Sequence, residues 1–192
     1  MIDIGTHALD LTLWMMNNYK PKYVVGNTYH KLAQTENAAN AFGPWNPAEF
    51  TVEDSAFGFI VMENGATIYL ESSWALNSLD VGEAQTTLHG TNGGADMKDG
   101  LRINGEADGM MYDKTMVLEP GGVDFYDGSG DDPAYLEAKQ WIESIQNDTE
   151  PVVSPEQALV VTQILEAIYQ SAKTGAPVYI NQHKEELGKI LV

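Results

Sequence analysis

The chain has 192 residues, of which 43% are hydrophobic, so it is long enough for one sizeable core and short for two independent ones. Its 28 acidic and 10 basic side chains give a net charge of -18, which argues against a nucleic-acid partner and against binding to an anionic membrane surface. The absence of cysteine excludes a disulfide framework and a thiol nucleophile, and makes the cytoplasm the default location.

The first element is a predicted helix that Lys20-Pro21 ends. At about 100° per residue, Asp3, His7 and Asp10 fall within roughly 60° of one another, and Trp14 extends the same polar stripe. A helix that is apolar on several sides normally lies inside a protein or between domains, so the polar stripe needs partners. The apolar residues form two stripes on other sides of this helix: Ile4, Ala8, Leu11 and Met15, and Leu9, Leu13 and Met16.

The spacing of Asp3, His7 and Asp10 allows three interpretations. In the first, Asp3 caps the helix and His7 is a buried histidine with a satisfied hydrogen bond. In the second, the carboxylates and the imidazole perform acid-base chemistry. In the third, a carboxylate and an imidazole four residues apart share a metal ion. No second carboxylate-histidine pair lies near His30 or His89 that could support one of these interpretations. Local spacing therefore leaves all three interpretations open.

Strands follow the first helix. Residues 22–31 form a strand-like run, and the loop after it, from 32 to about 51, is too long to be a mere connector. The β-rich runs 56–61 and 66–70 flank Glu63-Asn64-Gly65, and Asn-Gly readily takes the positive φ angles of a tight hairpin turn. In the second arm alternate residues share a face, so one face can pack against helices while the other stays polar.

The rest of the chain continues the antiparallel pattern and then changes to a helical period. Short runs at 84–89, 101–103 and 110–118 predict a meander, with turns between them at 90–94 and 127–130.

Two helices and a last strand complete the chain. Apolar residues at helical spacing predict a helix over Pro133–Asn147. A second helix begins after Ser154-Pro155, which are typical N-cap and N1 residues, and Gly175 lies just past its end. Residues 177–180 add a short strand. The order predicts an α+β fold, with an open, predominantly antiparallel sheet and helices packed on one face.

Cofactor and nucleophile motifs are absent from the sequence. No G-x-G-x-x-G follows a strand and no P-loop occurs, so we expect no cofactor-binding residues in this chain. The apolar part of the N-terminus is interrupted by polar residues, so it is neither a signal peptide nor a membrane span, and no later run approaches membrane-spanning length.

The segment Asp3–Leu11, DIGTHALDL, closely resembles the helix that opens the C-terminal domain of the glucose-fructose oxidoreductase and inositol dehydrogenase family (Gfo/Idh/MocA). Blocks at 52–56, 63–74, 89–94 and 157–175 resemble later blocks of that family in the same order, so the resemblance covers nearly the whole chain. It implies that residues 1–192 form a substrate, catalytic and oligomerisation domain. It also implies that the N-terminal Rossmann domain, which binds NAD or NADP, is missing, so the chain looks like a fragment.

The resemblance also implies roles for the stripe on the first helix. His7 becomes the candidate general base or acid, and Asp3 the candidate that holds the substrate hydroxyl or orients the imidazole. Asp10 extends the same face as a weaker candidate for binding substrate. An alcohol cannot deliver hydride to a nicotinamide ring while keeping its proton, and a positioned histidine that accepts this proton contributes roughly 10²–10⁴ in rate. No metal ligand is implied.

The expected function is therefore that of the C-terminal half of an NAD(P)-dependent oxidoreductase acting on a sugar, a cyclitol such as inositol, or a related polyol. We expect the isolated chain to be inactive, because the cofactor supplies the difficult chemistry. The expected partners are a carbohydrate or polyol substrate and further copies of the chain, joined through the sheet face. The alternatives are a non-enzymatic sugar-binding or oligomerisation module, and a metal-dependent lyase or isomerase with Asp3 and His7 as ligands.

Overall fold

The computed structural model describes residues 1–36, 43, 45–79, 82, 85–116 and 133–180. It divides into two compact units, one made of residues 1–84 and 157–192 and the other of residues 85–156. Each unit is described by itself. The predicted turn at 127–130 and the last residues of the predicted strand 110–118 lie outside the described residues.

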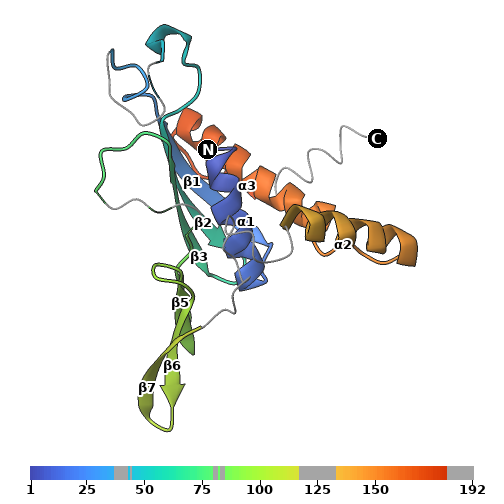
Figure 1. Ribbon diagram of the computed structural model, residues 1–192. Helices are drawn as coiled ribbons and strands as arrows, with labels where there is room; N and C mark the ends of the chain where they lie inside the picture. The colour runs from blue at the N-terminus through green and yellow to red at the C-terminus, as the bar shows by residue number, and fades with distance from the viewer. Residues whose placement is uncertain (37–42, 44, 80–81, 83–84, 117–132, 181–192) are drawn as a thin grey trace. The chain divides into compact units, whose positions relative to one another are not determined.

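The first unit contains a four-stranded antiparallel sheet in the order β3-β2-β1-β8, with two helices (Figure 1). The register pairs Val24 with Ile60 and Ile60 with Ile68, so these three side chains share one face of the sheet. The elements of this unit are α1 (Ile4–Met16), β1 (Pro21–Tyr29), the 3-10 helix η1 (Pro47–Glu49), β2 (Ser55–Met62), β3 (Thr67–Ser73), α3 (Pro155–Thr174) and β8 (Val178–Tyr179).

Both helices of this unit contribute to one hydrophobic core against that face of the sheet. Leu9 and Leu13 of α1 and Ile168 of α3 are fully buried in it with Val24 and Ile60 of the strands. Burying such aliphatic side chains is worth roughly 1.5–3 kcal/mol each, so this core fixes where α1 and α3 lie on the sheet.

Two glycines let α3 approach the sheet closely. Gly26 of β1 and Gly58 of β2 are cross-strand partners. A Cβ added at Gly26 would lie 2.6 Å from Ile168 Cγ2, and one added at Gly58 would lie 2.5 Å from Ile168 Cδ1. The Ile168 side chain therefore occupies the space that two strand side chains would otherwise fill.

The other face of this sheet carries aromatic and aliphatic side chains that this unit leaves exposed. On β3 the alternation agrees with the sequence, since Ile68, Leu70 and Ser72 are buried. On the neighbouring strands, however, the outward residues are largely apolar. We call this surface the open sheet face; its members are Tyr23, Val25, Tyr29, Phe57, Phe59, Tyr69 and Tyr179. Two ring pairs cross it, with centroids 5.4 Å apart for Tyr23 and Tyr179 and 6.0 Å apart for Tyr29 and Phe57.

The second unit contains an antiparallel meander and one helix. The strands lie in the order β4-β5-β6-β7, an antiparallel meander as predicted, although β5 was not among the predicted strands. The prediction of a turn over residues 90–94 was partly wrong, because Gly93 and Gly94 begin β5 and pair with Gly105 and Asn104. The elements of this unit are β4 (Leu88–His89), β5 (Gly93–Asp96), β6 (Arg102–Ala107), β7 (Met110–Thr115) and α2 (Pro133–Asn147).

The α+β fold class with antiparallel sheets is confirmed, with two corrections of detail. The first helix ends at Met16, earlier than Lys20, because Asn17 takes a left-handed conformation with φ of 45°. In the β2-β3 turn only Gly65 has a positive φ, of 87°, and the Asn64 side chain instead accepts a hydrogen bond from the Ala66 N–H at 3.0 Å. Among the described helices, none combines the length and the apolar character needed to cross a membrane.

Candidate active site

Helix α1 presents Asp3 and His7 on the side that the core leaves open. Its buried residues are Gly5, Leu9 and Leu13, and the side chains of Asp3 and His7 are exposed. Of the two apolar stripes predicted for this helix, the one that contains Leu9 and Leu13 is buried, whereas the one formed by Ile4, Ala8, Leu11 and Met15 is only partly buried within the described chain. Ile4 is exposed, and Trp14 is 60% exposed. The helix therefore packs on one side only, and the predicted site faces away from the sheet.

The structure brings Asp3 and His7 to neighbouring positions, one turn apart. Asp3 has right-handed helical backbone angles, so the helical spacing extends back to it. In the part of the chain that the structure describes, no hydrogen bond or ion pair joins the two side chains. Asp3 makes no side-chain capping bond and His7 is not buried, so neither feature of the purely structural interpretation is present.

Asp10 lies further along α1 and has a different environment. Its side chain is half-buried, and its charge acts on Tyr19. Burial, and after it the nearby Asp10 carboxylate, raise the pKa of the Tyr19 hydroxyl above its ordinary value. The contribution of Asp10 to substrate binding stays a prediction.

The first turn of α1 lies close against β3 because residue 5 is glycine. A Cβ at Gly5 would lie 3.1 Å from Met1 Cγ and 3.3 Å from Ser72 Oγ. Both contacts are tighter than an ordinary van der Waals approach, so a larger residue would push the turn outward. The Ser72 hydroxyl is buried and has no hydrogen-bond partner among the described residues.

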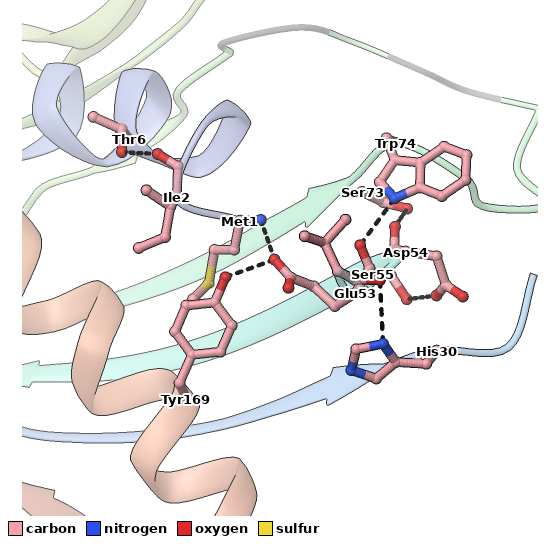
Figure 2. Close-up of polar contacts among 11 residues, drawn as sticks. Met1, Ile2, Thr6, His30, Glu53, Asp54, Ser55, Ser73, Trp74 and Tyr169 are labelled. Carbon is pink, nitrogen blue, oxygen red and sulfur yellow. Dashed lines mark hydrogen bonds and ion pairs between the residues drawn. The ribbon is translucent and has the colours of Figure 1, made fainter. Parts of the chain in front are cut away.

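The chain just before α1 is held by a buried carboxylate (Figure 2). Glu53 precedes β2 and is only 7% exposed. Its Oε1 atom accepts hydrogen bonds from the Met1 nitrogen and from the Tyr169 hydroxyl, the latter at 2.7 Å. Burial is the largest influence on the pKa of Glu53 and raises it, but these two hydrogen bonds, a backbone hydrogen bond of Glu53 and the charge of the Met1 ammonium together hold the pKa below its ordinary value.

The pKa of Tyr169 shifts in the opposite direction. Burial raises it most, and the hydrogen bond to the Glu53 carboxylate and its charge raise it further, while a backbone hydrogen bond from Ile2 opposes them. The phenol thus stays protonated and remains a donor to Glu53. Neither Glu53 nor Tyr169 was predicted from the sequence as part of a site. The only signal was an adjacent pair of acids, Glu53-Asp54, immediately before a buried strand.

Asp54 organises the loop that leaves β1. Its Oδ2 atom accepts hydrogen bonds from the backbone N–H groups of Lys31, Leu32 and Ala33, at 2.7 Å for Leu32 and 3.1 Å for Ala33. The Ser55 hydroxyl donates to the other carboxylate oxygen at 3.1 Å. This aspartate therefore has a structural role, since three backbone N–H groups and the Ser55 hydroxyl donate to its carboxylate.

An aromatic cluster borders the same segment. Trp74 donates through Nε1 to the Glu53 carbonyl at 2.9 Å, and its ring stacks on Phe50 at 4.7 Å. Trp45 meets Trp74 edge-on and donates to the Ala33 carbonyl at 2.8 Å. These contacts tie the 31–54 loop to the end of β3 beside Glu53.

Two further kinds of site, for a metal ion and for a dinucleotide, are not found among the described residues. Within them, no three histidine, aspartate or glutamate side chains gather closely enough to hold a metal ion. No described strand leads through a glycine-rich turn into a helix, which is the arrangement that binds a dinucleotide pyrophosphate. The described part of this chain therefore lacks this particular pyrophosphate-binding arrangement.

The chain is similar to known oxidoreductases over almost its entire length. The model of the oxidoreductase family C-terminal alpha/beta domain (Gfo/Idh/MocA) matches residues 1–180. The chain is 30% identical over 182 residues to D-glucoside 3-dehydrogenase of Escherichia coli (strain K12), covering 93% of this chain and 48% of that protein. The chain thus spans about half the length of the curated relative it matches.

Solved structures show the same fold. An oxidoreductase domain protein from Kribbella flavida superposes with a TM-score of 0.69 at 19% identity, covering 93% of this chain and 50% of that one. An oxidoreductase from Agrobacterium radiobacter, in complex with NAD+, L-tartaric acid and magnesium, has a TM-score of 0.63 at 20% identity, covering 94% and 49%. With the sequence match over residues 1–180, the conclusion is that this chain belongs to the Gfo/Idh/MocA oxidoreductase family and corresponds to its C-terminal α/β domain.

Proposed function

We propose that this chain is the substrate-binding and catalytic half of an NAD(P)-dependent oxidoreductase that acts on a hydroxyl group of a carbohydrate or polyol. The observation that carries the proposal is the family match over residues 1–180, which includes Asp3 and His7 on the open side of α1. The relative that is a D-glucoside 3-dehydrogenase supports a sugar as the substrate class, and the NAD+ bound to the Agrobacterium radiobacter protein supports a nicotinamide cofactor.

In the proposed site His7 takes the proton from the substrate hydroxyl. An exposed imidazole on a helix can accept a proton from a hydroxyl that contacts it and pass the proton to solvent. Asp3, one turn before it, accepts a hydrogen bond from the same hydroxyl or from the imidazole and so selects the orientation in which the proton moves. Neither role requires the two side chains to touch in the absence of substrate.

We place the cofactor outside these 192 residues. The described residues contain no glycine-rich strand-turn-helix that would bind a dinucleotide pyrophosphate. The apolar side chains beside the proposed site are exposed in this chain, namely those of Ile2, Ile4 and Trp14. A further polypeptide segment that covers them would exclude water and complete the pocket. The isolated 192-residue chain is accordingly expected to show negligible turnover.

The experiment uses the polypeptide that the gene encodes, with any residues that precede Met1. NAD+ and NADP+ reduction is measured with a panel of glucosides, free sugars and cyclitols. His7→Gln should lower kcat by roughly 10²–10⁴ with the assembly unchanged. His89→Gln, at an exposed histidine of β4, is the matched control and should retain full activity. Unchanged turnover in His7→Gln would contradict the assignment and favour a binding or assembly module.

The open sheet face supports a second copy of this chain as partner. Monomeric proteins rarely expose a contiguous apolar patch of this kind, and an antiparallel face can bury itself against the same face of a copy related by a twofold axis. Phe59→Glu, in the middle strand pair of that face, should lower the mass measured by sedimentation. Leu159→Glu, an exposed apolar position on α3, should leave it unchanged. A monomeric wild-type protein at micromolar concentration would refute this assembly.

A further inference from the structure

The first turn of α1 is held mainly by polar contacts. Ile2 and Ile4 are exposed, and among the first four side chains only that of Met1 packs against the core. The deeply buried residues of the helix, Leu9 and Leu13, lie one and two turns further along. The apolar core therefore anchors the middle of α1, whereas the position of its start depends on other interactions.

Glu53 and Tyr169 provide these interactions from two separate elements. The Glu53 carboxylate accepts from the Met1 nitrogen and from the Tyr169 hydroxyl of α3, as Figure 2 shows. The bond to Met1 requires only an N–H at that position. The Met1 carbonyl then accepts from the Gly5 N–H at 2.8 Å, so the held residue is itself part of the first helical turn.

We propose that Glu53 and Tyr169 are positioning residues that fix the first turn of α1 and thereby the placement of Asp3 and His7. For its consequence in catalysis the inference rests on the proposed function. The pair contacts Met1, two residues before Asp3, and makes no hydrogen bond to Asp3 or His7 in the described structure. At a rise of about 1.5 Å per residue, His7 lies roughly 9 Å along the helix from Met1, so a small rotation of the first turn is carried to both side chains.

A buried carboxylate is an expensive way to achieve stability alone. Taking a charge out of water costs several kcal/mol, and apolar residues of similar volume often stabilise a fold as well or better. A carboxylate oxygen that accepts from two donors instead restricts where the groups bearing those donors can lie, because both donors must point at the same oxygen. Such a directional interaction is appropriate at the start of α1, where the orientation of the first turn determines the positions of Asp3 and His7.

The test compares Tyr169→Phe with Tyr135→Phe in the 192-residue chain. Tyr135 is 59% exposed on α2 and serves as the matched loss of a hydroxyl. Amide hydrogen exchange is followed at Gly5, whose N–H reports the first turn, and at Ile60 in the core. In Tyr169→Phe we expect exchange at Gly5 to accelerate by about 10- to 100-fold, with less than about a twofold change at Ile60. Tyr135→Phe should alter neither.

A second readout follows the imidazole itself. The His7 NMR signals should shift or broaden in Tyr169→Phe and not in Tyr135→Phe, an effect that a general loss of stability would not produce. Glu53→Gln keeps an oxygen acceptor and should fall between wild type and Glu53→Ala in exchange at Gly5. Unchanged exchange at Gly5, equal acceleration at Gly5 and Ile60, or unmoved His7 signals would each overturn the inference. These measurements need no turnover, so failure of the proposed oxidoreductase activity would be seen separately.

Discussion

The packing of Ile168 against Gly26 and Gly58 can be tested by adding and removing single methyl groups. A Cβ at Gly58 would lie 2.5 Å from Ile168 Cδ1, about 1 Å short of ordinary contact, and the Ile168 side chain is fully buried. Because overpacking of this kind costs typically 1–3 kcal/mol, Gly58→Ala should lower the free energy of unfolding by about 2 kcal/mol. The displaced helix carries Tyr169, so the variant should also loosen the bond to Glu53.

Replacing Ile168 by valine removes the clashing Cδ1 methyl. Alone, Ile168→Val should cost about 0.5–1.5 kcal/mol. The double variant Gly58→Ala/Ile168→Val should lose at least about 1 kcal/mol less stability than the sum of the losses of the two single variants. A double-mutant cycle in urea unfolding measures this difference. Gly26→Ala is the matched control, because its Cβ meets Ile168 Cγ2, at 2.6 Å, a methyl group that valine keeps. Additive losses for Gly58→Ala and Ile168→Val, or equal rescue of Gly26→Ala, would refute this packing.

Three further changes test other parts of the structure. The interactions that lower the pKa of Glu53 favour its ionised form in the folded protein. The stabilisation that Glu53 provides is therefore present above the ordinary glutamate range and is lost as the pH falls through the lowered pKa. The difference in unfolding free energy between wild type and Glu53→Gln should shrink on acidification from pH 6 to 3, and a constant difference would contradict this prediction. Asp54→Ala removes the acceptor for three backbone N–H groups, so it should lower the free energy of unfolding by about 3 kcal/mol and make the loop after β1 susceptible to proteolysis. Asp113→Ala, at an exposed position of β7, should have neither effect. Gly65→Ala places a side chain at a φ of 87° in open space and should cost about 1–2 kcal/mol in thermal or urea unfolding through backbone strain alone, so an unchanged stability would count against the turn geometry.

Local signals in the sequence were sufficient for most of the secondary structure. Pro155 after Ser154, and Gly175 with φ of 68°, mark the two ends of α3 because helix termini have specific backbone requirements. Asn64-Gly65 likewise marks the β2-β3 hairpin. The β5 strand was missed because glycines are typical of turns. There Gly94 is needed for close pairing, since a Cβ on it would lie 2.7 Å from the Leu88 carbonyl oxygen.

The site was only partly predictable for a different reason. Asp3 and His7 are four residues apart, so helical geometry alone puts them on one side of α1. Glu53 and Tyr169 are 116 residues apart in sequence, and no periodicity reports a hydrogen bond between them. The burial of α1 was overestimated because a pattern shows which residues are apolar, whereas burial depends on what covers them. Ile4 and Trp14 are apolar and exposed in this chain.

The central claim, that His7 moves the proton of the substrate hydroxyl, is tested most directly by chemical rescue. His7→Ala in the polypeptide that the gene encodes is assayed for NAD(P)+ reduction with and without added imidazole, beside His89→Ala. We expect His7→Ala to lose most of its activity, imidazole to restore part of that activity in proportion to its concentration, and imidazole to leave His89→Ala unaffected. Activity of His7→Ala within a factor of about two of wild type would contradict the claim.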